Sequence, residues 1–87
     1  MGMPSGSQPE PGPFAMAIAS ELRSAMARHM VSGAELARKT GRSQSYLSKR
    51  LRAESSFTAN DVEDICRVLG EDLEALLVAA ARASRRR

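Results

Sequence analysis

The side chains best suited to contact another molecule lie in one short segment, residues 43–52. Gln44 carries an amide that can pair with two atoms on the edge of adenine, and Lys49 can donate to O6 and N7 of guanine. On a helix, positions 45, 48, 49 and 52 are three and four residues apart, so they share one exposed face. The segment therefore predicts a helix that reads bases in the major groove through Gln44, Ser45 and Lys49.

Other polar and basic residues around this face are predicted to contact the DNA backbone. Phosphate oxygens accept hydrogen bonds from cations, from hydroxyls and from the free amides at a helix start. These predicted backbone contacts are Arg38, Arg42, Ser43, Tyr46, Ser48, Arg50 and Arg52. Alternatives stay open: a basic helix face can simply be solvated, Gln44 and Ser45 can contact phosphate instead of bases, and the Tyr46 ring can pack on the preceding helix.

Two short helices are predicted to position this face. Ser32 and Glu35 have the spacing of a capping box, which predicts a helix start, and Gly41 can end that helix in the left-handed conformation. Ser43 then caps a second helix, from Gln44 to about Arg52. Two such helices joined by a short turn that contains glycine are typical of a helix-turn-helix unit.

Three further helices are predicted from apolar periodicity and caps. The first runs from Phe14 to about His29. The fourth begins after Thr58 and ends at Gly70, and the fifth begins after Asp72. Their expected core positions include Phe14, Ile18, Leu22, Ala25, Met16, Met26, Met30, Val62, Ile65, Cys66, Leu69, Leu73, Leu76, Leu77 and Ala80, together with Leu36, Ala37, Leu47 and Leu51 of the central pair.

The charge of the chain is distributed unevenly along the sequence. The net charge is +3. Basic residues outnumber acidic ones over 32–57 and again after 78, whereas acidic residues outnumber basic ones over 58–77. Separated charge of this kind favours a polyanionic partner. We therefore expect double-stranded DNA as the partner.

The sequence offers little for catalysis or for metal binding. Its single cysteine, Cys66, cannot form an internal disulfide or a thiolate metal site, and His29 has no ligand at suitable spacing. We find no nucleophile paired with a base, no phosphate-binding glycine loop and no apolar run near the ~20 residues of a membrane span. We expect a cytoplasmic, nucleoid-associated protein that is not an enzyme, with no metal, cofactor or small-molecule ligand.

A family resemblance agrees with this interpretation. The segment AELARKTGRSQSYLS (34–48), followed by Phe57-Thr58, DVEDI (61–65), VLG (68–70) and LEALL (73–77), resembles the Xre family, the phage-repressor and Cro type of helix-turn-helix. The resemblance implies a compact all-α, five-helix, lambda-repressor-like domain that binds operator DNA, commonly as a dimer. It also implies phosphate contacts by Ser32 and Ser43, and base contacts by Gln44, Ser45 and Lys49.

Two positions depart from the family pattern. Many members have Glu near the end of the reading helix, followed by Gly, where this chain has Leu51, Arg52 and Ala53, so that helix is expected to be longer or rotated at its end. Gly33 replaces a longer polar residue that often supports the DNA contact.

The predicted organisation is an N-terminal disordered arm (1–13), a DNA-binding domain (14–84) and a basic tail (85–87). The predicted function is sequence-specific transcription regulation, as a repressor. A homodimer through Leu73, Leu76, Leu77 and Ala80 is a further expectation. The alternatives are a protein-binding module on the same fold, such as an antitoxin or a phage accessory protein, and a nonspecific architectural DNA binder.

Overall fold

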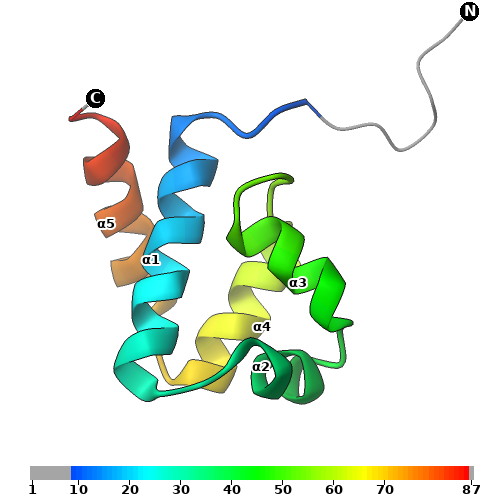
Figure 1. Cartoon of the computed structure of the whole chain (residues 1–87). Coiled ribbons are helices and arrows are strands. Elements are labelled where there is room, and N and C mark those ends of the chain that lie inside the picture. Colours follow the sequence, from blue (N-terminus) through cyan, green and yellow to red (C-terminus); the bar gives the residue numbers. More distant parts are fainter. Residues whose placement is uncertain (1–8, 87) are drawn as a thin grey trace, which may run out of the picture.

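A computed structural model describes residues 9–86, and within this range the chain forms five helices and no strand (Figure 1). They are α1 (Pro13–His29), α2 (Gly33–Thr40), α3 (Gln44–Leu51), α4 (Ala59–Leu69) and α5 (Leu73–Ser84). The predicted all-α, five-helix fold is confirmed. Most of the predicted arm, residues 1–8, and the last residue of the tail lie outside the described range.

Four helices start at side-chain caps, as the sequence predicts, but one predicted detail is wrong. The Ser32 hydroxyl accepts from the Glu35 amide at 3.1 Å, whereas the Glu35 carboxylate pairs with Lys39 Nζ at 3.4 Å instead of turning back to Ser32. The full capping box is at α4. There the Thr58 amide donates to Asp61 Oδ2 at 3.0 Å, and the Asp61 amide donates to the Thr58 hydroxyl at 3.1 Å.

The helix ends explain where α2, α3 and α4 stop. Gly41 and Gly70 end α2 and α4 in the left-handed conformation, with φ of 73° and 74°, as predicted. Ala53 takes the same conformation after α3, with φ of 60°. The Ala53 amide donates to Arg50 O and the Glu54 amide to Lys49 O, both at 3.0 Å, which closes the helix without glycine. The helix therefore ends at Leu51, with Arg52 as its cap.

The core lies where the helices converge. Leu22, Leu36, Leu47 and Ile65 are fully buried. The fifth helix packs along α1 on one side of the molecule, and α2 and α3 lie on the other side (Figure 1). Cys66 is buried among these residues, as expected.

Not every methionine predicted as core is buried. Met26 lies on the inner stripe of α1 and is buried, whereas Met16 and Met30 are 42% and 89% exposed. Met16 is two residues from Ile18, so on a helix it points to a different side from the inner stripe. Met30 follows the last residue of α1 in the left-handed conformation, and its side chain is left in solvent.

Candidate nucleic-acid interface

The second and third helices form one packed unit with a three-residue turn, residues 41–43. Leu36 and Ala37 of α2 and Leu47 of α3 are buried in the common core. An eight-residue helix is too short to be stable alone, so this shared burial and the two serine caps must hold both helices in place. The unit therefore presents the outer side of α3 on a fixed support.

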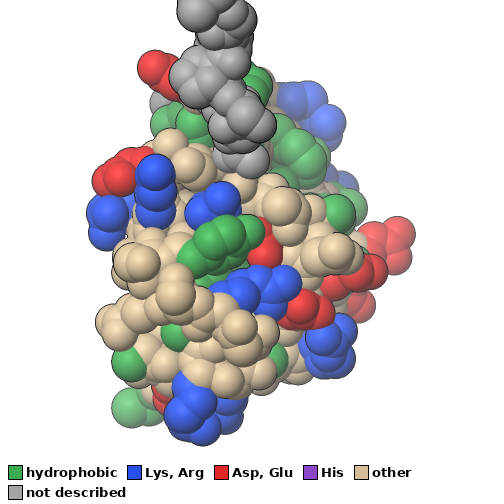
Figure 2. Space-filling view, turned by 90° about the vertical axis from the view of Figure 1, so that its right-hand side faces the viewer, with side chains coloured by type: hydrophobic (Ala, Val, Ile, Leu, Met, Phe, Trp, Pro, Cys, Tyr) green, Lys and Arg blue, Asp and Glu red, His purple; other side chains and the backbone are tan. Residues whose placement is uncertain are grey.

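Gln44, Ser45 and Lys49, the three predicted base-reading residues, are all exposed on α3. None of them is in an ion pair or a side-chain hydrogen bond among the described residues. Figure 2 views the molecule from the side on which α2 and α3 lie. Lys and Arg side chains are spread over this face, and polar side chains and backbone fill most of the surface between them. Gln44, Ser45 and Lys49 can therefore approach a polyanion without first breaking a side-chain contact of their own.

Of the eight residues predicted to contact phosphate, four are exposed and four are partly buried. Ser32, Arg38 and Ser43 are exposed, and Ser48 is half-buried. The Ser43 hydroxyl accepts from the Tyr46 amide at 3.1 Å and still has a proton to donate. Arg52 is exposed but pairs with Glu54 at 2.7 Å, which would have to open for Arg52 to reach a phosphate. The other three, Arg42, Tyr46 and Arg50, are partly buried.

Arg42 lies in the turn, and all three nitrogens of its guanidinium group have partners inside the domain. Nε pairs with Asp61 Oδ1 at 2.7 Å, Nη1 donates to Thr40 O at 3.1 Å and Nη2 pairs with Asp64 Oδ2 at 2.9 Å. Burial alone would lower the pKa of Arg42, but the two carboxylates outweigh it and raise that pKa. Arg42 thus holds the turn against α4, and a phosphate contact would require it to leave two carboxylates.

Tyr46 faces the protein rather than the solvent. Its hydroxyl donates to Asp61 Oδ2 at 2.8 Å. Of the two possibilities for this ring, solvent-side contact with DNA or packing inside the domain, the structure shows packing. The ring packs against the common core, and the hydroxyl links α3 to α4. Burial, followed by the hydrogen bond to Asp61, raises the pKa of the Tyr46 phenol.

Arg50 covers the ring of Tyr46. Its guanidinium carbon is 3.6 Å from the ring centroid, and Nη1 makes a long contact of 3.4 Å with the Tyr46 carbonyl oxygen. The Nε atom is buried without a hydrogen-bond partner among the described residues. Stacking a cation on an aromatic face is favourable, so Arg50 fixes the ring of Tyr46.

Asp61 and Arg23 are the important residues that the sequence analysis missed. Asp61 is 2% exposed and joins α4 to both α3 and the turn. The spacing Thr58-x-x-Asp61 matches a capping box and could have identified it as a structural carboxylate. Arg23 of α1 donates from Nη1 to the carbonyl oxygen of Leu51, the last residue of α3. No local pattern in the sequence predicts that contact, because it joins residues far apart in the chain.

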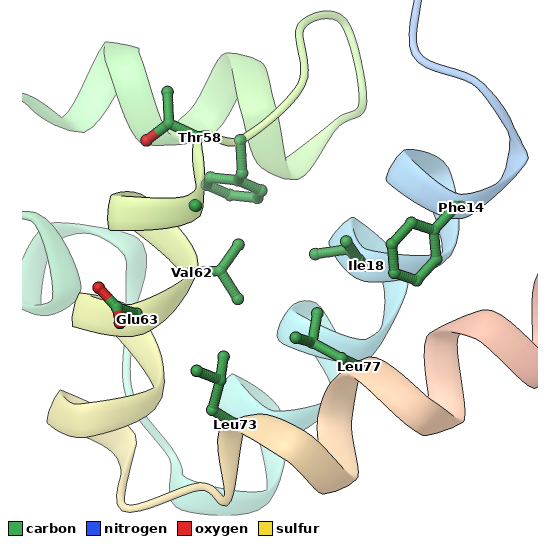
Figure 3. Close-up of a pocket in the computed structure, with 9 residues that line it drawn as sticks. Phe14, Ile18, Thr58, Val62, Glu63, Leu73 and Leu77 are labelled. Atoms are coloured by element: carbon green, nitrogen blue, oxygen red, sulfur yellow. The ribbon is translucent and has the colours of Figure 1, made fainter.

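A separate apolar groove of about 350 Å³ opens between α1, α4 and α5 (Figure 3). Its lining includes no residue of α3, and one of its two phenylalanines, Phe14, is 44% exposed. Its other lining residues are Ile18, Phe57, Thr58, Ala59, Val62, Glu63, Leu73 and Leu77.

The described residues contain no cluster of His, Cys, Asp or Glu that could hold a metal ion. None of the helices in that range is long and apolar enough to cross a membrane.

Comparison with known proteins agrees with this geometry. Two crystal structures of the clp gene regulator ClgR from Corynebacterium glutamicum are similar to this chain. One is 30% identical with a TM-score of 0.78, covering 88% of this chain and 81% of that chain. The other is 29% identical with a TM-score of 0.73, covering 78% and 88%. No curated protein sequence gives a significant match. Residues 17–80 match the family model described as "Helix-turn-helix domain", and the chain therefore belongs to that helix-turn-helix family.

Proposed function

We propose that this protein is a sequence-specific DNA-binding transcription regulator that places α3 in the major groove. The observation that carries the proposal is the exposed set Gln44, Ser45 and Lys49 on the second helix of a helix-turn-helix unit. Family membership and the likeness to a gene regulator support a DNA-binding regulator. The placement of α3 is supported by its free outer face. Binding to chromosomal DNA would place the protein with the nucleoid in the cytoplasm.

Affinity and sequence discrimination come from different residues in this proposal. Contacts to phosphate supply affinity on any sequence, and contacts to base edges supply discrimination. The exposed Ser32, Arg38 and Ser43 are suited to phosphate, whereas Gln44 and Lys49 are suited to bases. Arg42 and Tyr46 are left out of the proposed contact surface because their polar groups are already bonded inside the domain.

We propose repression as the mode of regulation. A domain with α3 in the major groove and α2 across the backbone covers one face of its site. Other proteins that need the same stretch of duplex are then excluded for as long as the domain is bound. The assignment of the chain to the Xre type of helix-turn-helix belongs to the same proposal, and it depends on the motifs of residues 34–77.

A second copy of the chain is the partner that we propose besides DNA, but the predicted contact needs revision. Leu76 and Ala80 are 5% and 0% exposed because α5 packs them against its own domain, so they are not available to a partner. Leu73 and Leu77 are half-buried in the groove of Figure 3. The outer side of α5 instead presents Val78, with one residue of each charge a helical turn away, Glu74 and Arg82.

This outer side of α5 is complementary to itself in an antiparallel arrangement. Glu74 and Arg82 each lie four residues from Val78. A two-fold axis through Val78 would therefore bring each Glu74 opposite the Arg82 of the other copy. Among the described residues α5 does not contact α3, so such a pair leaves both reading helices free.

The test is the selection of bound sites from random duplex DNA, followed by affinity measurements on variants. We expect one preferred sequence, with Gln44→Ala and Lys49→Ala each weakening discrimination at individual base pairs by about 1–3 kcal/mol. Arg38→Ala is the matched control. It should weaken binding to all sequences alike and reduce the dependence on salt by about one counterion. If the variant that carries both Gln44→Ala and Lys49→Ala selects the same site with unchanged affinity, α3 is not the reading helix.

A further inference from the structure

The orientation of α3 depends on a side chain that does not belong to the helix-turn-helix unit. Among the described residues, the backbone of α3 packs on α2 and α1, and that of α4 packs on α1, α2 and α5, with no close backbone approach between α3 and α4. Side chains bridge this separation. The hydroxyl of Tyr46 reaches from α3 to the carboxylate of Asp61, which lies in the first turn of α4.

The carboxylate of Asp61 receives one donor from each of three segments. Arg42 Nε of the turn binds Oδ1 at 2.7 Å, Tyr46 of α3 binds Oδ2 at 2.8 Å, and the Thr58 amide before α4 binds Oδ2 at 3.0 Å. The Asp61 side chain is 3% exposed, so water cannot replace a lost donor easily. Hydrogen bonds to a buried charge are among the stronger ones in proteins.

This arrangement fixes the rotation of α3 about its own axis. Leu47 and Leu51 bury the inner side of α3, but apolar contacts are not directional and tolerate a small rotation. The hydrogen bond from the Tyr46 hydroxyl to Asp61 is directional, so it favours one rotation of α3. Arg50 stacks on the same ring from the next turn of α3. Gln44 and Lys49 then point outward at a defined angle.

We propose that Asp61 is a positioning residue for sequence recognition, acting through Tyr46 and Arg42 to hold α3 at the angle from which its outer side chains reach base edges. The inference rests on the proposed function, since it assumes that α3 reads the major groove. Loss of the hydrogen bond between Tyr46 and Asp61 lowers the population of molecules in which α3 has this orientation. Affinity for the preferred site is then reduced. Binding to random DNA uses phosphate contacts that tolerate such a rotation, so it changes little.

Tyr46→Phe is the variant that isolates this role. It removes the hydroxyl but keeps the ring on which Arg50 stacks, and it leaves Asp61 bonded to Arg42 and Thr58. Asp61→Asn is the second variant, and it removes the charge at the centre of the cluster. Val68→Ala, a truncation of a half-buried side chain elsewhere on α4, serves as a control for destabilisation alone.

The measurement is the ratio of the Kd for random duplex to the Kd for the selected duplex, taken at a temperature where every variant is folded by circular dichroism. We expect Tyr46→Phe to lower this ratio about tenfold, the effect of one hydrogen bond to a charged group. Its Kd for random duplex should stay within about twofold, as expected for binding through phosphates. Asp61→Asn should lower the ratio at least as much, and Val68→Ala should leave it unchanged.

Four results would overturn the inference. An unchanged ratio in Tyr46→Phe would show that the hydrogen bond between Tyr46 and Asp61 does not affect recognition. If Val68→Ala lowers the ratio as much as Tyr46→Phe does, the hydrogen bond between Tyr46 and Asp61 contributes to stability and not to recognition. If the wild-type protein prefers no duplex, the proposed function fails and this inference fails with it. If Gln44→Ala and Lys49→Ala change the preference but Tyr46→Phe and Asp61→Asn do not, only the inference fails.

Discussion

At the residue scale, the polar residues predicted to read bases are exposed on α3, whereas its aromatic residue, Tyr46, is partly buried. Ser45 and Lys49 are exposed because they lie on the opposite side of α3 from Leu47 and Leu51, whereas Gln44 is exposed as the first residue of the helix. Tyr46 is different, since its ring can cover apolar neighbours and its hydroxyl needs one partner. Whether that partner lies in DNA or in Asp61 depends on tertiary packing, which no local pattern in the sequence specifies.

Met30 gives a residue-scale prediction about stability. It has φ of 56° and a side chain that is 89% exposed, so the residue accepts a left-handed backbone with little packing in return. Glycine adopts this conformation without steric cost. Met30→Gly should therefore raise the free energy of unfolding by about 1 kcal/mol, measured by denaturant titration.

Gly70→Ala is the reverse control for this prediction. Gly70 has φ of 74°, and a Cβ built on it meets nothing within 4 Å, so the substitution changes only backbone strain. We expect a loss of similar size, about 1 kcal/mol. A loss of stability in Met30→Gly would contradict the conformational account of how α1 ends.

At the element scale, the helices and their bounds are largely predictable from sequence, whereas the links between them are not. Serine, threonine and aspartate caps and the two glycines mark most helix ends, because they satisfy the free amides and carbonyls of the last turns. The end of α3 was harder to predict, since Ala53 takes a conformation more common for glycine. The bridges from Arg42 and Tyr46 to Asp61, and from Arg23 to Leu51, appear only when the helices are packed.

The Asp61 bridge predicts how the domain responds to acid. Burial alone would raise the pKa of Asp61, but donors from Thr58, Tyr46 and Arg42 outweigh it and hold that pKa below its usual value. A carboxyl with a lowered folded pKa contributes stability above its unfolded pKa of about 4 and loses it as the pH falls through the folded pKa. The free energy of unfolding should therefore be nearly constant between about pH 5 and pH 7 and fall at lower pH.

Asp61→Asn tests the source of that acid response. At pH 7 it should cost about 2 kcal/mol of unfolding free energy, because a buried hydrogen-bonded charge is removed. Below about pH 4 its stability should fall less steeply than that of the wild type. Asp64 and Glu71 also have lowered pKa values through their ion pairs, so part of the slope should remain. If the unfolding free energies of the variant and the wild type depend on pH with the same slope, Asp61 is not protonated in this pH range.

At the scale of the whole molecule, the two sides of the domain are suited to different partners. The second and third helices present polar and basic side chains on one side, and α5 lies on the other side of α1 (Figure 1). The likeness of this chain to a known regulator covers most of its length. Residue types and spacing lead to the proposed DNA-facing side, and the residues predicted to read bases there are exposed. The predicted dimer contact needs revision because Leu76 and Ala80 of α5 are buried in the core of their own domain, which the sequence does not show.

The α5 pairing predicts a charge-reversal result. A twelve-residue helix is only about 18 Å long, much smaller than a standard interface, so self-association should be weak. Sedimentation equilibrium should show a monomer–dimer equilibrium that Glu74→Arg or Arg82→Glu shifts to the monomer. The double variant, which restores opposite charges, should restore association. If the two single variants associate as the wild type does, α5 is not the contact.

The proposed function places the outer side of α3 against base edges in the major groove. It is tested most directly by a photocrosslinker attached at Ser45→Cys. The native Cys66 is buried, and burial raises the pKa of its thiol, so it should not be labelled in the folded protein. With the selected duplex we predict crosslinks confined to one or two base pairs and formed on their major-groove edges. A matched label at Ala75→Cys, an exposed position on α5, should give none. Crosslinking from position 45 that is no stronger than from position 75, or that falls on the minor-groove edges, would contradict the account.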